Sequence, residues 1–351
     1  MNSGGPLPSG DLDYIEREGA GLWPQLRGAR IFVTGATGFF GRWVIESLLW
    51  ADRRHGLGVR VLALSRDPGA FLAASPHLAG PGVRWLTGSV ATLEPGDLAG
   101  EECDMVVHLA TEGDMLASAS DPLAAAGVIT DGTRRALEVA ARKGACRFLF
   151  TSSGAVYGPI SRAVERIPEA YPDAPDPLDK ASPYAVPGEA KRQAELLCVM
   201  RAQQEGLGAV IARGFSFAGP GLPTGGKFAF GNFMADALAG RPIVIKGDGT
   251  TVRSYLYAAD LAVWLLTLLL RGAPGRAYNV GSEEAVSLLQ LAEMIGAELG
   301  SPRVDVLQQA KPGAVPDRYV PATQRPREEL GLREQFSLPE IIRRTAAWHR
   351  A

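Results

Sequence analysis

The 351-residue sequence has only three cysteines, and their positions do not suit a metal site. Cys103, Cys146 and Cys198 stand far apart, and no cysteine or histidine pair has the spacing of zinc ligands. We therefore expect free thiols and no bound metal. Free thiols are typical of a reducing compartment, which predicts a cytoplasmic location.

Long charged runs and long apolar runs are also missing. The net charge is −2 and no long stretch has one sign, so the sequence indicates neither a nucleic-acid partner nor a membrane partner. The longest apolar run, 261–270, is interrupted by Thr267 and is too short to span a bilayer. Residues 1–10 are rich in Gly, Pro and Ser and lack the pattern of a signal peptide. We expect a mobile tail there.

Glycines spaced three apart are the most informative feature that is present. The apolar run Ile31–Val33 leads into Gly35, Gly38 and Gly41, and the amphipathic run 43–50 follows. This order predicts a strand, a tight turn and the start of a helix, whose free N–H groups suit a pyrophosphate. The alternative is a glycine-rich turn without a ligand. The predicted cofactor contacts in this segment are Gly35, Thr37, Gly38, Phe39, Phe40 and Gly41.

Further apolar runs follow at the spacing of alternating strands and helices. The expected strands are 59–64, 83–86, 104–109 and 147–150. Helices are expected over 11–26 and 132–143. Alternation of this kind predicts a parallel sheet with helices on both faces and ligands at the carboxyl ends of the strands. Thr34, Ser65, Ala110 and Ser153 fall at such ends. His108 lies inside an apolar strand, which favours a core histidine over a catalyst.

The end of the second strand bears on the choice between NAD and NADP. An acidic residue there accepts from the ribose 2′-OH of NAD, whereas an arginine accommodates the 2′-phosphate of NADP. The sequence has Ser65, then Arg66, then Asp67. Both cofactors therefore remain open, and a solvated Arg66 without a ligand is the structural alternative.

Prolines become frequent after Tyr157, and residues 158–187 are expected to form mostly loop. Later residues alternate again, with helices expected over 188–204, 261–270 and 288–299 and strands over 209–213, 252–257 and 277–280. We expect a tail and outer helix over 1–28 and a dinucleotide-binding Rossmann-type domain over 29–187. Residues 188–351 are expected to combine late sheet elements with a smaller substrate domain. The predicted class is a doubly wound α/β fold.

Together these segments resemble the extended short-chain dehydrogenase/reductase family, specifically its NAD-dependent epimerase/dehydratase branch. The resemblance covers about residues 20–345. The matching segments are 34–41, 108–110, 151–158, 188–192, 219–221, 253–255, Asp260 and 278–281. The resemblance implies a Rossmann domain with NAD (NADP as the alternative), with Leu109, Ala110 and Thr111 at the cofactor. It also implies a nucleoside-diphosphate sugar as substrate and a homodimer formed by helices such as 132–143 and 188–204.

The family's chemistry uses a serine or threonine and a tyrosine four residues before a lysine. A nearby ammonium favours the phenolate, which can then take a proton from a sugar hydroxyl. Ser153 and Lys191 match this pattern, but Pro187 stands where the tyrosine would be. The nearest tyrosine is Tyr184. Pro187 disfavours a continuous helix unless it sits in the first turn, so Tyr184 is expected on the loop just before the helix.

Three interpretations follow from Pro187. Tyr184 acts from a displaced position, or another group such as Glu112 or Tyr157 moves the proton, or the site has lost redox chemistry and only binds nucleotide.

A second departure concerns the acidic residues that follow the serine or threonine in the family's dehydratases and decarboxylases. Gly154 and Ala155 stand there, which favours epimerisation or carbonyl reduction.

The substrate side is assigned from the resemblance alone. Arg253 resembles the family's pyrophosphate-binding arginine, and Arg318 is a second candidate. Asn232 and the loop at 227–228 resemble the part of the family that holds the nucleoside. Ser216 replaces a frequent asparagine, and Glu112 is a candidate near the sugar. The leading hypothesis is a nucleotide-sugar epimerase acting through a transient 4-keto sugar. The alternatives are an NADPH-dependent keto-sugar reductase, a dehydratase and a redox-inactive binding homologue.

Overall fold

The computed structural model describes residues 4–111, 121–179, 182, 185–226, 228–301 and 303–351. Its centre is a seven-stranded parallel sheet with the order β11-β6-β5-β4-β1-β2-β3. The strands are β1 (Arg30–Thr34), β2 (Arg60–Ser65), β3 (Val83–Thr87), β4 (Met105–His108), β5 (Arg147–Ser153), β6 (Gly208–Gly214) and β11 (Ala277–Val280). The predicted fold class is confirmed. The order reverses between β1 and β4, so ligands are expected in the crevice at their carboxyl ends.

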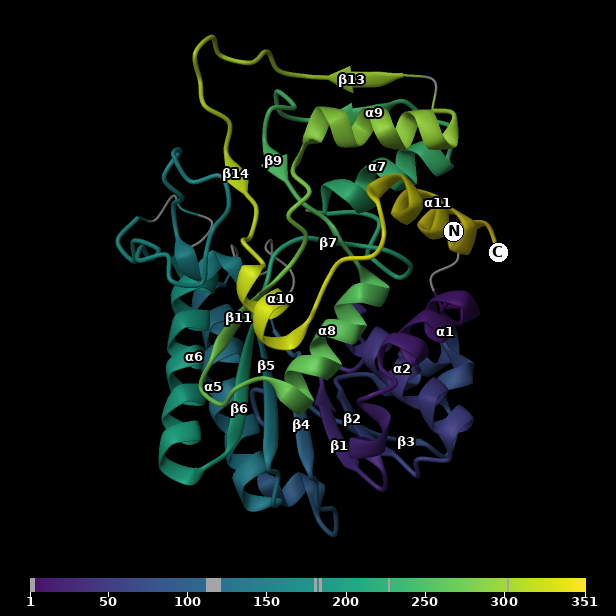
Figure 1. Cartoon of the computed structure of the whole chain (residues 1–351), viewed down its shortest axis with the longest axis vertical. Helices are drawn as coiled ribbons and strands as arrows, with labels where there is room; N and C mark the ends of the chain where they lie inside the picture. The colour runs from purple at the N-terminus through teal and green to yellow at the C-terminus, as the bar shows by residue number, and fades with distance from the viewer. Residues whose placement is uncertain (1–3, 112–120, 180–181, 183–184, 227, 302) are drawn as a thin grey trace.

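Two hydrophobic cores lie on the two faces of this sheet. Successive strand residues point to opposite faces, and accordingly Val33 belongs to one core and Phe32 to the other. The first face packs against α1 (Ser9–Glu18), α2 (Phe39–His55) and α8 (Ala258–Arg271). The second packs against α5 (Pro122–Arg142) and α6 (Ala185–Glu205), so the sheet is covered on both sides (Figure 1).

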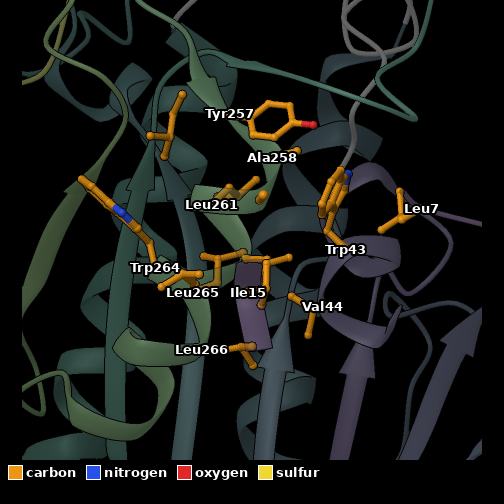
Figure 2. Close-up of a cluster of buried hydrophobic side chains, with 14 of the residues drawn as sticks. Leu7, Ile15, Trp43, Val44, Tyr257, Ala258, Leu261, Trp264, Leu265 and Leu266 are labelled. Carbon is orange, nitrogen blue, oxygen red and sulfur yellow. The ribbon is translucent and has the colours of Figure 1, made fainter. Parts of the chain in front are cut away.

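The first core is densest where α1, α2 and α8 meet. Ile15, Trp43, Val44, Leu261 and Leu265 point toward one another there (Figure 2). All five side chains are almost completely removed from solvent. Burying large side chains fully contributes roughly 1.5–3 kcal/mol each, so this junction fixes α2 against α8 and thereby sets the position of the turn before α2.

The remaining C-terminal elements form a smaller unit beyond the carboxyl ends of the strands (Figure 1). It contains α7 (Ala229–Leu238), α9 (Leu288–Leu299) and three small sheets. The sheets pair β8 (Ile243–Ile245) with β13 (Val304–Val306), β7 (Phe217–Ala218) with β10 (Leu256–Tyr257), and β9 (Val252–Arg253) with both β12 (Val286–Ser287) and β14 (Arg318–Tyr319). The remaining helices are α3 (Pro68–Ala74), α10 (Gln324–Leu330), α11 (Leu338–Arg350), η1 (Trp23–Leu26), η2 (Pro76–Leu78), η3 (Pro95–Leu98) and η4 (Gly154–Tyr157).

Several of the expected elements differ in extent from the structure. Helix α5 begins at Pro122, ten residues before the expected helix 132–143. The expected helix 11–26 is divided into α1 and η1, with Pro24 in the first turn of η1. The expected strand 252–257 is two strands, because β9 pairs with β12 and β14 whereas β10 pairs with β7. Helix α6 begins at Ala185, three residues earlier than expected. Pro187 therefore lies in its first turn, where a backbone N–H has no intrahelical acceptor.

The expectation of a mobile tail is wrong for residues 4–10. Leu7 is buried, and its backbone N donates to Glu46 Oε2 at 2.8 Å. The Arg42 guanidinium donates to the carbonyls of Gly4 and Gly5, and Trp348 Nε1 donates to Pro6 O. These partners come from α2 and α11, so the segment is held by contacts far away in the sequence. No helix among the described residues has both the length and the apolar character needed to cross a membrane.

Candidate functional site

A cleft of about 800 Å³ opens at the carboxyl ends of the strands, between the sheet and the C-terminal unit. Its lining includes residues that follow β1, β2, β3, β4, β5 and β6. Most of the predicted cofactor set lines it: Gly35, Thr37, Gly38, Phe39, Phe40, Ser65, Arg66, Leu109, Ala110, Thr111 and Lys191. The structure therefore brings together residues that are up to 156 positions apart, from Gly35 to Lys191.

The glycine turn has the close approach that the spacing predicts. Gly35 has a φ of +66°, and a Cβ there would lie 2.7 Å from Ala110 N. A Cβ on Gly41 would lie 2.4 Å from Gly35 O. Gly41 is therefore needed for packing α2 onto the turn and does not line the cleft, so its expected cofactor contact is not found. Gly38 is the N-cap of α2 and directs the first N–H groups of the helix to the turn.

The end of β2 places Ser65 and Arg66 at the cleft and Asp67 away from it. The Thr37 and Ser65 hydroxyls lie 3.4 Å apart. Arg66 is exposed and lines the cleft. Asp67 caps α3 by accepting from Ala70 N at 2.9 Å. Its carboxylate is used as a helix cap, which removes it from the residues that face a bound ribose.

His108 is a core histidine, as predicted. The Thr133 hydroxyl donates to Ile129 O, so the Nε2–H of His108 donates to Thr133 Oγ1 at 3.1 Å. Nδ1 then accepts from Thr34 Oγ1 at 2.7 Å, and Thr34 Oγ1 accepts from Ala110 N. Burial, aided by the charge of Lys191, lowers the pKa of His108 to about 3. The neutral ring thus fixes the strand end beneath the cleft and has no proton to exchange there.

Ser153 and Lys191 both face the cleft, and Pro187 lines it as well. Lys191 Nζ donates to Thr151 O at 2.7 Å and lies 4.6 Å from the Phe150 ring centroid. Burial lowers the pKa of Lys191 to about 8, against the opposing effect of the Glu195 charge. Pro187 has no ionisable group, so this turn of α6 presents the lysine without a phenol four residues before it.

Two of the three candidate proton carriers lie outside the described residues: Glu112 and Tyr184. The third, Tyr157, is 1% exposed and does not line the cleft. Its hydroxyl donates to Asn279 Oδ1 at 2.6 Å and accepts from Arg213, and burial raises its pKa to about 12. The suggestion that Tyr157 moves the proton is therefore wrong, because its hydroxyl is committed to the core.

The two residues that follow Ser153 are not acidic. Gly154 and Ala155 begin η4, and a Cβ on Gly154 would lie 2.4 Å from the Tyr319 hydroxyl oxygen. A larger side chain at residue 154 therefore has no room beside Tyr319. Among the described residues that line the cleft there is no Asp and no Glu.

The predicted substrate residues separate into two groups. Arg253 and Ser216 line the cleft, and Arg253 is oriented by Asp317 Oδ2 at 2.7 Å. Asn232 and Arg318 do not line it. Asn232 Nδ2 donates to Gly226 O, and Arg318 Nε donates to Glu165 O. Both side chains stabilise neighbouring loops, so their expected substrate contacts are not found.

Sequence reasoning missed an aromatic part of the cleft wall. Phe215, Phe217, Phe230 and Tyr255 all line it. Phe228, which was expected near the nucleoside, lines it as well. The phenylalanines lie in segments whose richness in Phe, Gly and Pro is visible in the sequence. The spacing of these residues did not indicate that β7, β10 and the start of α7 place them on one side of the cleft.

Comparisons with known proteins place similar proteins in one family. The family model described as "NAD dependent epimerase/dehydratase family" matches residues 31–281. UDP-glucuronic acid decarboxylase 1 of Arabidopsis thaliana is 28% identical over 316 residues, which cover 90% of this chain and 68% of the relative. The dTDP-glucose 4,6-dehydratase of Streptomyces griseus is 27% identical over 327 residues, covering 91% and 93%. The solved structure of UDP-glucose 4-epimerase from Thermotoga maritima has a TM-score of 0.78 at 24% identity, covering 92% and 98%, and shows the same fold.

Proposed function

Because the chain belongs to the NAD-dependent epimerase/dehydratase family, we propose that it is a nucleotide-sugar epimerase that uses NAD. The observation that supports this best is the charge of the cleft wall. Its ionisable groups among the described residues are Arg66, Lys191, Arg253 and Tyr255, with no carboxylate. Cations suit the pyrophosphates of NAD and of a sugar nucleotide. Gly154 and Ala155 stand where the family's dehydratases have acidic residues. This disfavours dehydration, which needs a proton carrier at further sugar carbons.

The turn between β1 and α2 has a geometry that suits NAD. Gly35 and Gly38 have no side chains to cover the backbone of the turn. The first N–H groups of α2 lie at this turn, where they can bind a pyrophosphate. Ser65 and Arg66 lie where the adenosine ribose is expected. When bound, NAD supplies the acceptor and donor of a hydride at the sugar carbon.

The reacting end contains Ser153 and Lys191. Ser153 Oγ accepts from Ala155 N at 3.2 Å, which leaves the hydroxyl proton to donate to a sugar oxygen. The Lys191 ammonium favours a negative oxygen beside it. We propose that Tyr184 moves the proton from the sugar 4-hydroxyl, as expected from the sequence, and that the sugar passes through a 4-keto form.

The substrate end is proposed to hold the diphosphate at Arg253. Its guanidinium is held by Asp317 and by Val252 O and lies 5.6 Å from the Tyr319 ring centroid. An arginine fixed in this way presents its remaining N–H groups to phosphate oxygens. Ser216, on the same wall, is proposed to contact the sugar or the phosphate.

The test combines released ligands with product masses. Purified protein is denatured and the released small molecules are identified, and intact protein is incubated with UDP-glucose and with dTDP-glucose. We expect stoichiometric NAD and a product of unchanged mass whose C4 hydrogen is retained from the substrate. A product lighter by one water indicates a dehydratase instead. Protein that neither contains nor binds NAD would contradict the proposal.

A second candidate is an NADPH-dependent keto-sugar reductase, because the exposed Arg66 lines the cleft and Asp67 is turned to α3. In that case the cleft is filled only by added NADPH, and Arg66→Ala weakens NADPH binding while NADH binding is unchanged. Pro187 favours a third candidate, a redox-inactive homologue that binds nucleotide sugar. Any turnover that depends on Lys191 excludes it.

We also propose a homodimer formed across α5 and α6. Leu123 is 85% exposed and Leu196 is 59% exposed, and both line a hollow on this outer face. An apolar surface between two helices suits a matching pair from a second copy. A cytoplasmic location is proposed as well, supported by three cysteines that are all free thiols.

A further inference from the structure

Two side chains of α6 hold two consecutive residues of β5. Lys191 and Glu195 are four residues apart, so they lie on one face of the helix. Lys191 Nζ donates to Thr151 O at 2.7 Å, and Ser152 Oγ donates to Glu195 Oε1 at 2.6 Å. The next residue of the strand is Ser153, the hydroxyl proposed to orient the sugar.

The Glu195 carboxylate is itself fixed from a third element. Arg213 on β6 donates from Nε to Oε1 at 2.9 Å and from Nη2 to Oε2 at 2.6 Å. The Arg213 and Glu195 side chains are only 15% and 10% exposed. A bidentate pair of this kind has one preferred geometry, and removing one charge leaves the other buried and unpaired.

Arg213 extends the network to the segment that follows β5 and, through Tyr157, to β11. Its Nη1 donates to the Tyr157 hydroxyl and to Glu169 O, each at 3.1 Å. The Tyr157 hydroxyl donates to Asn279, whose backbone N donates to Glu169 Oε1. One carboxylate therefore connects α6, the ends of β5 and β6, and the chain that follows β5.

From these contacts we infer that Glu195 is a positioning residue for the proposed reaction, holding Ser153 and Lys191 in register across α6 and β5. The inference rests on the proposed function, since it concerns the same two side chains. Its physical basis is that reacting groups displaced by about 1 Å lose roughly 100-fold in rate. Glu195 does not line the cleft, so it acts only through the groups that it holds.

The charge of Glu195 adds a measurable signature. Four titratable side chains face Glu195 or Lys191. They are Cys198 on α6, Arg213 on β6, Tyr157 in η4 and His108 on β4. The carboxylate charge raises the pKa of Lys191 and so opposes the effect of burial. Removing this charge lowers that pKa further, so activity that needs the Lys191 ammonium falls off at a lower pH.

The test compares Glu195→Gln with Glu189→Gln, which makes the same change on the same helix. Glu189 is partly exposed and lies 3.7 Å from Arg192. We expect kcat for the nucleotide sugar to fall by about 10- to 100-fold in E195Q, and the alkaline limb of the pH–rate profile to move to lower pH. E189Q should match the wild type in both. Equal kcat and an unmoved limb in E195Q would overturn the inference.

Ser152→Ala provides a second variant, because it removes one contact and leaves the Glu195–Arg213 pair intact. The combined loss in S152A/E195Q should be smaller than the product of the single losses, and independent losses would overturn the inference.

If the wild type turns over no nucleotide sugar, the proposed function fails separately, and the Lys191 side chain is then titrated by NMR. The chain has only six lysines, which makes the signal assignable. An unchanged Lys191 pKa in E195Q would refute the positioning role.

Discussion

Replacing Gly35 by alanine tests whether the turn after β1 depends on a missing Cβ atom. Gly35 has a φ of +66°, a conformation that costs an L-residue roughly 1–2 kcal/mol. The new Cβ would also lie 2.7 Å from both Ala110 N and Leu109 C, which are backbone atoms of the neighbouring strand end. Overpacking against such atoms costs about 1–3 kcal/mol. We therefore expect Gly35→Ala to lower the free energy of unfolding by about 2–5 kcal/mol.

Gly56→Ala is the matched control at the other end of α2. Gly56 also has a positive φ, +54°, but a Cβ there has no heavy atom within 4 Å. Only the backbone cost of roughly 1–2 kcal/mol applies to it. Urea unfolding of both variants isolates the contact with Ala110, and calorimetric titration with NAD measures its effect on binding. G35A should bind NAD more weakly than wild type, whereas G56A should bind it equally well.

Equal stabilities for the two variants would refute this reasoning. That result would mean that β4 and the turn separate easily, so the close approach would not define the pocket. Unchanged NAD affinity in G35A would show that the first N–H groups of α2 stay available when the turn shifts. The cofactor would then be held mainly from elsewhere in the cleft.

Three further predictions follow from the same structure. Ser153→Ala should lower kcat by about 100-fold with unchanged NAD content, measured by product formation and by NAD released on denaturation. Burial raises the pKa of Asp260 from 3.8 to about 7, so between these values the folded state retains a proton that the unfolded state has lost. Stability should therefore fall as pH rises across that window, and Asp260→Asn should abolish this part of the dependence in thermal melts at several pH values. Leu196→Glu, which places a charge on the exposed α6 face, should convert a dimer to a monomer in sedimentation experiments without changing NAD content.

The central sheet was predictable because its signals are local. Ile31–Val33 is apolar, glycines follow at fixed spacing, and each later strand is a short apolar run before small or polar residues. The position of Ser153 in the cleft follows from that arrangement, because parallel strands end at one edge of the sheet. Lys191 on α6 and Arg253 on β9 were expected there from the family resemblance and not from the strand pattern.

The errors occurred where distant partners decide the structure. Residues 4–8 have a composition that is typical of a mobile tail, but their carbonyl and N–H groups are paired with Arg42, Glu46 and Trp348. Arg318 has the chemistry of a ligand contact, yet its Nε donates to Glu165 O, 153 residues away, and it does not line the cleft. A sequence shows which groups need partners, whereas the fold determines which partners are in reach.

Pro187, near Lys191, also shows the difference between what the sequence indicates and what the fold determines. From the sequence alone, a proline four residues before Lys191 suggested that Tyr184 acts from a displaced position, that another group moves the proton, or that the site has lost redox chemistry. In the structure α6 runs from Ala185 through the proline, because a first-turn residue needs no backbone N–H. Lys191 therefore keeps its contact with Thr151, and Glu195 keeps Ser152. Pro187 stands where the family pattern has a tyrosine, while the contacts of Lys191 and Glu195 with β5 are present, so the proposed reaction depends on which group moves the proton.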